Sequence, residues 1–181
     1  MTKTDKCLSI QGQHNRYQIK KLIGQNQEQT TRKHLEKWDI DDRWFHNDQQ
    51  IGLVERNHEM IVTEIQTKLG SYRQQDVLKK RLDENKLVTY AETQKLLLQD
   101  SMTCHYCRTQ VFVLYKKTRD MQQWSLDRIN NDYGHNADNV VISCLKCNLE
   151  RKTRSAAKFR DAKQMVVVRK EYHEGNDGDS V

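Results

Sequence analysis

Four cysteines form two pairs with the same spacing, and this is the clearest chemical signal in the chain. Cys104 and Cys107 make the first pair, and Cys144 and Cys147 make the second. A two-residue gap forms a tight turn that directs both sulfurs at one point, so two such pairs can complete a tetrahedral Zn²⁺ site. We therefore expect one structural zinc ion. The 36 residues between the pairs exceed the usual loop of a zinc ribbon, which predicts a folded insert.

Three short motifs accompany the second cysteine pair, in an expected order of strand, loop, strand and helix. They read Leu126-Asp127-Arg128-Ile129, then Asn139-Val140-Val141, then Cys144-x2-Cys147-Asn148 with basic residues beyond. Together they resemble the ββα-metal finger of the HNH endonuclease family. The resemblance covers residues 104–154, which is under a third of the chain. It implies a nuclease module built around the insert.

The resemblance also implies roles for single residues. In the family, the first strand commonly ends in an Asp-His pair, in which Asp binds a divalent metal and His activates water. A middle Asn holds that His, and an Asn or His on the helix completes the metal site. By position, Asp127 and Asn148 would bind the metal and Asn139 would orient the base. One carboxylate, one amide and waters suit Mg²⁺ or Mn²⁺ better than Zn²⁺, so we expect a catalytic Mg²⁺ or Mn²⁺ beside the zinc.

The identity of the general base is the main departure from the family pattern. Arg128 stands where the family most often carries its histidine. A guanidinium stays protonated to about pH 12, so Arg128 is suited to bind phosphate and not to accept a proton. His135, which follows Gly134 in the loop, is the nearest titratable group that could act as the base. The alternative is that His135 is only a turn residue.

Basic residues concentrate in the half of the chain that holds the cysteines. Residues 101–173 carry 14 Lys and Arg against 7 Asp and Glu, a balance of +7, while the whole chain has a formal charge of +6. This coincidence predicts a polyanionic partner, DNA, for that half. The alternative is a solvated face that keeps the chain soluble. The cations expected to contact phosphates along a helix are Lys146, Arg151, Lys152, Arg154 and Lys158.

The overall composition limits the class of protein. Only 35% of the 181 residues are hydrophobic and 31% are charged, so a structural metal would add needed stability. No apolar run approaches the roughly 18 residues of a membrane span, and the first residues lack a signal-peptide core. We therefore expect no membrane partner, no secretion, and a reducing intracellular compartment, either cytoplasm or nucleus. Cys7 is left as an unpaired thiol.

We expect an α+β fold in which a mainly helical N-terminal half precedes a zinc-stapled ββα-metal module and a C-terminal helix. Four segments follow from this. They are a polar, flexible arm at 1–34, a helical region at 35–100, the HNH nuclease module at 101–173 and a disordered tail at 174–181. The helical region would recognise DNA, bind a protein partner or form a homodimer.

Local signals place the helices that precede the first cysteine pair. Apolar residues at helical spacing run from Val54 to Leu82, and Gly70-Ser71 is expected to break this run into two helices. Thr89 and Glu92 match a capping box, which predicts a helix that begins there and ends near Asp100. That helix would lead directly into the cysteine turn.

Other signals place the elements within and after the insert. Val111–Tyr115 is an apolar run that predicts a strand. Residues 124–126 and 140–142 predict two short strands joined by a loop rich in Gly, Asn and Asp. Apolar residues at helical spacing from Leu145 to Phe159 predict one helix, continuing toward Val168.

The most direct interpretation is a metal-dependent DNA endonuclease of HNH type. It would hydrolyse phosphodiester bonds with a single divalent metal and an activated water, since a bound cation can stabilise the charge of the transition state and of the leaving oxygen. One alternative is a non-catalytic zinc-knuckle protein that binds nucleic acid, which Arg128 would favour. A structural zinc module for protein contacts is a third class, and it leaves the positive charge without a use.

Overall fold

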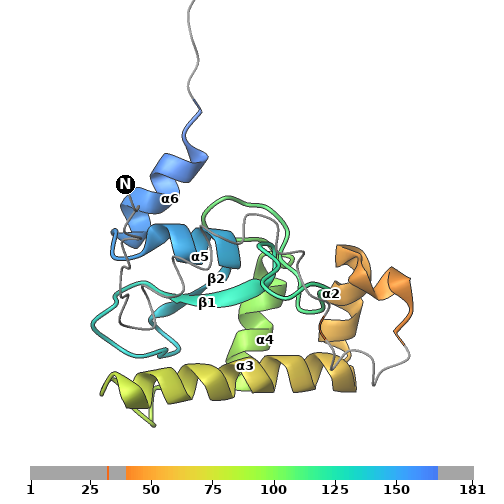
Figure 1. Ribbon diagram of the computed structural model, residues 1–181, viewed down its shortest axis with the longest axis horizontal. Coiled ribbons are helices and arrows are strands. Elements are labelled where there is room, and N and C mark those ends of the chain that lie inside the picture. The colour runs from red at the N-terminus through yellow and green to blue at the C-terminus, as the bar shows by residue number, and fades with distance from the viewer. Residues whose placement is uncertain (1–31, 33–39, 167–181) are drawn as a thin grey trace, which may run out of the picture.

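The computed structural model describes Arg32 and residues 40–166. The arm and tail expected at 1–34 and 174–181 lie outside that part of the chain, apart from Arg32. Its elements, drawn in Figure 1, are a 3-10 helix η2 (Asp42–Phe45), the helices α2 (Asn47–Glu55), α3 (Glu59–Leu78) and α4 (Tyr90–Gln99), the strands β1 (Trp124–Arg128) and β2 (Val140–Cys144), and the helices α5 (Leu145–Arg151) and α6 (Ala156–Gln164). Helices with a small sheet fit the expected α+β class. Within the described ranges, no helix is both long and apolar enough to cross a membrane.

The two strands form an antiparallel pair that is followed directly by a helix. Trp124 lies opposite Cys144, and Arg128 lies opposite Val140. The chain passes from β2 into α5 without a linker. The predicted order of strand, loop, strand and helix is therefore present. Each strand extends two residues further at its C-terminal end than the sequence predicted.

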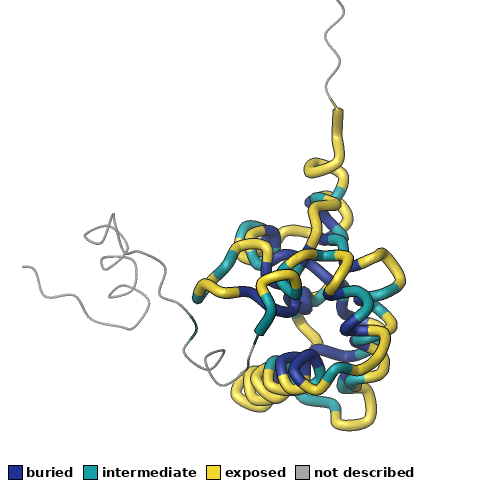
Figure 2. The backbone as a smooth tube through the Cα atoms, turned by 90° about the vertical axis from the view of Figure 1, so that its right-hand side faces the viewer, coloured by how far each residue is buried: buried dark blue, intermediate teal, exposed yellow. Residues whose placement is uncertain are grey.

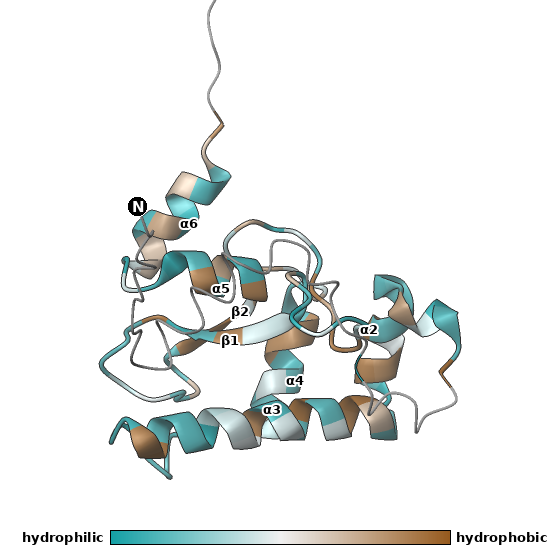
Figure 3. Ribbon diagram, viewed as in Figure 1, coloured by the Kyte–Doolittle hydropathy of each residue, from teal (hydrophilic) through white to brown (hydrophobic). Residues whose placement is uncertain are grey.

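Helix α3 runs along one side of the sheet (Figure 1). Ile61 and Ile65 are buried, and Leu69 and Tyr72 continue the same face at helical spacing. Figure 3 shows hydrophobic and hydrophilic residues alternating along this helix, as expected when one face is packed and the other meets water. The hydroxyl of Tyr72 accepts a hydrogen bond from the backbone N–H of Leu126 at 3.0 Å, which joins α3 to β1.

One hydrophobic cluster joins the helical region to the cysteine-bearing region. Leu53, Ile61 and Leu97 come from helices before residue 100, and Trp124 and Leu126 come from β1. Figure 2 shows the buried segments gathered in the middle of the fold, with exposed residues on the outer turns. Because residues on both sides of the boundary expected at residue 100 share this cluster, burial of apolar surface stabilises the two regions together.

The helix start predicted at Thr89 is confirmed. The hydroxyl of Thr89 accepts the N–H of Glu92 at 3.3 Å, and the carboxylate of Glu92 accepts the N–H of Thr89 at 2.8 Å. These reciprocal bonds form the capping box that the sequence indicated. The helix ends at Gln99, next to its predicted end near Asp100. The following turn carries the first cysteine pair.

The break predicted at Gly70-Ser71 is wrong, because α3 continues through both residues. Gly70 lies on the exposed side of the helix, and the hydroxyl of Ser71 donates to the carbonyl of Thr67 one turn earlier at 3.2 Å. A glycine inside a helix costs about 1 kcal/mol relative to alanine, which the packing of the opposite face outweighs. The chain turns instead at Asn57, between α2 and α3, where φ is 53°.

The strand predicted at Val111–Tyr115 is also wrong, because this run belongs to neither strand of the described sheet. The N–H groups of Val111 and Phe112 donate to the carbonyls of Met102 at 2.8 Å and Gln122 at 3.0 Å. Further bonds to its backbone come from the side chain of Gln50, which reaches in from α2 and is completely buried. The Oε1 atom of Gln50 accepts the N–H groups of Val113 at 2.8 Å and Leu114 at 3.0 Å, and its Nε2 donates to the Leu114 carbonyl at 2.9 Å. At Val113 and Leu114, a buried amide therefore takes the place of a neighbouring strand.

The single helix predicted from Leu145 is two helices. The first ends at Arg151 and the second begins at Ala156. Between them Lys152 has a φ of 53°, in the left-handed region, which ends a helix because the next turn cannot continue in register. The second helix ends at Gln164, and Met165 and Val166 are not helical, so the predicted continuation toward Val168 is wrong at these two residues. Residues 167 and 168 fall beyond the described part.

The role of Gln50 can be tested by thermodynamic measurement. Gln50→Ala leaves two backbone N–H groups and one carbonyl without their partner in a buried place. We expect the free energy of unfolding in urea to fall by about 2–4 kcal/mol. Gln49→Ala removes the neighbouring, exposed glutamine and should cost less than about 0.5 kcal/mol. Equal losses for the two variants would show that the bonds of Gln50 to Val113 and Leu114 do not stabilise the fold.

Candidate metal centre and polar cleft

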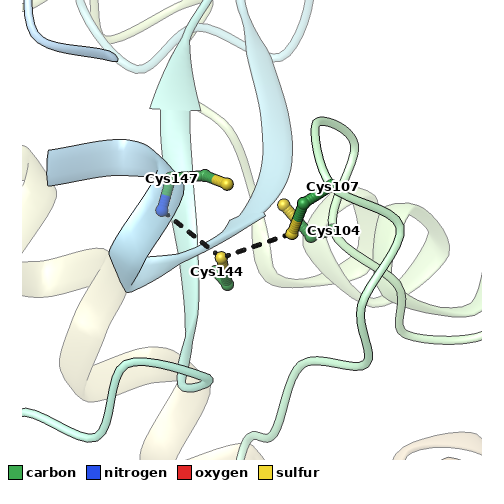
Figure 4. Close-up of side chains that lie close together, drawn as sticks. All are labelled: Cys104, Cys107, Cys144 and Cys147. Atoms are coloured by element: carbon green, nitrogen blue, oxygen red, sulfur yellow. Dashed lines mark hydrogen bonds between the residues drawn. The ribbon is translucent and has the colours of Figure 1, made fainter. Parts of the chain in front are cut away.

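The four paired cysteines converge at one point, as Figure 4 shows. Cys104 and Cys107 lie in the turn after α4, Cys144 ends β2, and Cys147 lies in the first turn of α5. Their sulfur atoms all lie within 4.8 Å of one another, and those of Cys107 and Cys144 are 3.8 Å apart. A tetrahedral zinc with bonds of about 2.3 Å places its sulfurs about 3.8 Å apart. The cluster could therefore hold a metal ion such as zinc.

Burial and hydrogen bonding also suit the sulfur cluster to a cation. A hydrogen bond from the Cys144 thiol lowers the pKa of Cys104 to about 5, and the same contact raises the pKa of Cys144. Burial raises the pKa of Cys147 to about 12. Neighbouring sulfurs therefore resist becoming thiolates together. A divalent cation is what would stabilise them in that form.

A polar cleft of about 490 Å³ lies beside the end of α3, β1 and α5. Four of the five residues predicted to be catalytic line this one cleft: Asp127, Arg128, His135 and Asn148. The fifth, Asn139, is buried in the loop that carries His135. Tertiary structure therefore gathers side chains that are spread over more than twenty positions of the sequence.

Asp127 is buried at the end of β1, and two side chains hold its carboxylate. Arg151, the last residue of α5, donates from Nη2 to Oδ1 at 2.8 Å and from Nε to Oδ2 at 2.5 Å. The hydroxyl of Tyr106 donates to Oδ2 at 2.6 Å, and burial together with this bond raises the pKa of Tyr106. Among the described residues Oδ1 accepts this one bond, so it retains a lone pair for a further ligand.

Arg151 was expected to contact phosphate from a solvent-exposed helix face, but it does not lie on such a face. Its side chain is 2% exposed. Besides Asp127, it donates to the carbonyls of Arg128 at 2.6 Å and Arg154 at 2.7 Å. The bond to Asp127 raises the pKa of Arg151, which stays cationic. Its donors are used inside the fold. Arg151 forms an internal ion pair because β1 brings the carboxylate of Asp127 to the end of α5.

His135 is buried at the edge of the cleft and is held by α3. Its Nδ1 lies 2.9 Å and 3.0 Å from the two carboxylate oxygens of Asp76, and its backbone N–H donates to Asp76 Oδ2 at 2.7 Å. Burial lowers the pKa of His135, and the charge of Asp76 raises it by less, so the imidazole is neutral near pH 7. The carboxylates only accept, so the proton is assigned to Nδ1 and the free lone pair to Nε2.

Asp76 is a residue of the site that the sequence did not indicate. It is completely buried, and it lies one helical turn after Tyr72, whose ring packs on the imidazole of His135 with centroids 4.5 Å apart. A carboxylate that continues the apolar face of α3 was the available signal, because a buried charge needs a partner. That partner lies 59 positions along the chain, and no local pattern identifies it.

Gly134 permits the close approach of the loop to α3. A Cβ atom at this position would lie 2.6 Å from the carbonyl oxygen of Arg81 and 2.9 Å from Oδ2 of Asp76. Backbone cannot yield cheaply at such distances, so only glycine fits there. The absence of a side chain at Gly134 is therefore what lets the next residue, His135, reach the carboxylate.

Asn139 ties the two ends of the same loop together. Its Nδ2 donates to the carbonyls of Asn130 at 2.9 Å and Gly134 at 3.0 Å, and its Oδ1 accepts the N–H of Asn130 at 2.9 Å. Both N–H donors of the amide and one lone pair of its oxygen are used in this way. Asn139 thus holds the backbone immediately before His135.

Asn148 of α5 and Arg128 of β1 both line the cleft. The Nδ2 of Asn148 donates to the hydroxyl of Ser125 and the carbonyl of Leu126, each at 3.2 Å, and neither bond uses its Oδ1. Arg128 donates to the carbonyl of Tyr133 at 3.2 Å, and burial lowers its pKa. A guanidinium remains charged at neutral pH even so.

The cleft has a basic rim that the sequence only partly revealed. The other predicted phosphate contacts are exposed: Lys146, Lys152, Arg154 and Lys158. Of these, Lys152 lines the cleft. Two further cations line it from the other side, Lys79 at the end of α3 and Arg81 just beyond. The charge count over residues 101–173 missed them, because it does not show which residues outside that segment fold against the cleft.

No family model matches this chain, and no curated protein or solved structure matches it either. The HNH resemblance therefore rests on the sequence motifs alone.

The metal-binding role of the cysteines predicts a stoichiometry and a loss. Purified protein should contain about one zinc per chain by elemental analysis, and Cys144→Ser should lower both zinc content and thermal stability, because binding energy at such a site is folding energy. Cys7→Ser, at the one cysteine outside the two pairs, is the matched control and should change neither. A folded, zinc-free protein would contradict the assignment.

Proposed function

We propose that this chain is a metal-dependent DNA endonuclease of HNH type, whose fold is stabilised by zinc at the four cysteines. The observation that carries the proposal is one cleft, on a strand–loop–strand–helix unit, that combines an acid, an amide, a neutral imidazole and a guanidinium. These are Asp127, Asn148, His135 and Arg128. They supply metal ligands, a base and a phosphate contact for hydrolysis of a phosphodiester.

The residues present fit a hard divalent cation such as Mg²⁺ or Mn²⁺. Oδ1 of Asp127 retains a lone pair. The amide nitrogen of Asn148 makes the hydrogen bonds within the fold, so its oxygen can bind a cation. A cation there would share the charge of Asp127 with Arg151. When bound, it would stabilise the charge that the phosphate and the leaving oxygen gain in the transition state.

His135 is suited to accept the proton of the attacking water. Its lone pair at Nε2 takes a proton while the water oxygen forms a bond to phosphorus and the bond from phosphorus to the leaving oxygen breaks; the leaving oxygen is protonated from solvent. The Nδ1–H bond to Asp76 holds the imidazole, and Asn139 holds the backbone before it. The ring is already neutral, so it can accept a proton without losing one first. Arg128 is the adjacent guanidinium, and it contributes charge to the phosphate and not proton transfer.

The cations at the cleft supply the contact with DNA in this proposal. Lys79 and Arg81, from the end of α3, Lys152, from the end of α5, and Arg128 all line the cleft. Phosphates bind such side chains without regard to base sequence. The helical region thus contributes to DNA binding through the end of α3. A homodimer or a protein partner for this region stays a prediction.

Zinc would position the catalytic residues as well as stabilise the fold. Asn148 directly follows the ligand Cys147, and Tyr106, which bonds Asp127, lies between the ligands Cys104 and Cys107. One ion would therefore fix Asn148 and Tyr106 relative to each other.

A non-catalytic zinc-knuckle protein that binds nucleic acid is the second candidate, and one observation favours it. The carboxylate of Asp127 is already paired with Arg151 and bonded by Tyr106, as a structural carboxylate would be. Both candidates require zinc and basic surfaces. They differ in whether a cation and a water act at the cleft.

Cleavage of supercoiled plasmid decides between the two candidates. Zinc-loaded protein should cut it with Mg²⁺ or Mn²⁺ and not with EDTA. Asp127→Asn keeps the shape of the side chain and should lower the rate by about 100-fold or more, since it removes the charge that binds the metal. His135→Ala should lower the rate by about two to four orders of magnitude. Because burial lowers the pKa of His135, the rate should fall only as pH drops below 6.5.

Asp138→Asn makes the same chemical change at an exposed position of the loop and should leave the rate unaltered. Zinc content and thermal unfolding of each variant exclude loss of fold as the cause. DNA binding without any cleavage by the wild-type chain would refute the endonuclease and favour the zinc-knuckle protein.

The basic rim makes a separate prediction about salt. Lys79→Ala and Arg81→Ala should each weaken binding to any duplex and reduce the slope of log affinity against log salt by roughly one, because one phosphate contact is lost. Lys95→Ala, at an exposed position on α4, is the control and should leave the slope unchanged. Unchanged slopes for both rim variants would move the DNA away from the end of α3.

A further inference from the structure

Helix α3 holds His135 at three independent points. The backbone N–H of His135 and its Nδ1 both reach the carboxylate of Asp76, and the ring of Tyr72 covers the imidazole at an angle of 31°. Tyr72 and Asp76 are one turn apart, so one face of one helix provides all three contacts. The loop that carries His135 comes close enough only because residue 134 is glycine.

We propose that Asp76 is a positioning residue for the general base, and that α3 therefore completes the catalytic site of the ββα unit. The inference rests on the proposed function, because it assigns Asp76 a role toward His135 as the base. Asp76 does not touch the reacting atoms. It acts by fixing which nitrogen of His135 carries the proton and where the other nitrogen points.

The double contact separates this role from a simple loop anchor. The bond from the His135 N–H to Asp76 Oδ2 at 2.7 Å would suffice to hold the loop. The further contacts of Nδ1, at 2.9 Å and 3.0 Å, fix the ring and place its proton on Nδ1. A base needs that tautomer, since only then does Nε2 have a lone pair to accept a proton.

Charged groups on two elements face the imidazole and set its protonation. From α3, Asp76 favours the imidazolium and Lys79 opposes it, and from β1 Arg128 also opposes it. Arg128 lies 4.0 Å from Asp76 and so balances part of its charge. Removing the carboxylate would leave burial and two cations, all of which favour the neutral ring. The pKa of His135 should therefore fall in Asp76→Asn.

Histidine-selective ¹⁵N NMR on the zinc-loaded chain tests the inference without DNA. Comparison with His135→Gln identifies the signal of His135 among the seven histidines. The wild-type ring should carry its proton on Nδ1 when neutral, and Asp76→Asn should change the tautomer ratio and lower the pKa. Asp138→Asn should alter neither. A wild-type ring protonated on Nε2, or a signal unchanged in Asp76→Asn, would overturn the proposal, and the first result does not require the Asp76 variant to fold.

Cleavage assays provide the second readout. Asp76→Asn should reduce the rate by about tenfold or more while DNA affinity is kept, and the fall of rate at acid pH should shift to lower pH. Combined with His135→Ala it should cause no further loss, because both changes disable one unit. If the wild-type chain does not cleave DNA, the proposed function fails, while the NMR result still decides whether Asp76 fixes the ring of His135. Additive losses in the double variant would reduce Asp76 to a structural residue.

Discussion

The buried guanidinium of Arg151 joins segments on which the rest of the site depends. It binds both carboxylate oxygens of Asp127 from β1, and Tyr106 of the first cysteine turn bonds the same carboxylate. Removing one partner of a buried ion pair costs about 3–5 kcal/mol, because the remaining charge is left unpaired. The pair therefore fixes the end of β1 against the end of α5. Through these elements it sets the places of Arg128 and Asn148 at the cleft.

The same ion pair explains the electrostatics of the cleft. The two buried carboxylates, Asp76 and Asp127, are each bonded by partners within the fold. The cations at the rim, Lys79 and Lys152, are exposed. A surface whose negative charges are compensated and whose positive charges face water attracts polyanions. In both proposed functions the cleft would contact DNA through these cations, and only the catalytic assay separates the two.

The helical region and the cysteine-bearing region form one structure and not two independent units. They share a hydrophobic cluster, and the side chain of Gln50 satisfies a loop more than sixty positions later. The contacts of α3 extend this dependence to the site, since Tyr72 and Asp76 hold both β1 and the loop of His135. A change in α3 can therefore affect the cleft without any change in the ββα unit.

The sequence by itself determined the features that depend on short spacing. The paired cysteines predicted their convergence, the capping box at Thr89 marked a helix start, and apolar runs located both strands. Local geometry is sufficient for these, because a turn, a cap or a strand involves neighbours in the chain. It also predicted Asp127, His135 and Asn148 as site residues, and they do line one cleft.

Only the tertiary structure decided which partners those residues have. It paired Arg151, which was expected to contact phosphate, with Asp127. It bonded part of a run predicted to be a strand to the amide of Gln50, and it brought Asp76 to His135. Each is a contact of buried polar groups across 24 to 64 positions of sequence. Burial makes an unpaired polar group costly, so each must find a partner, but spacing along the chain does not specify which one.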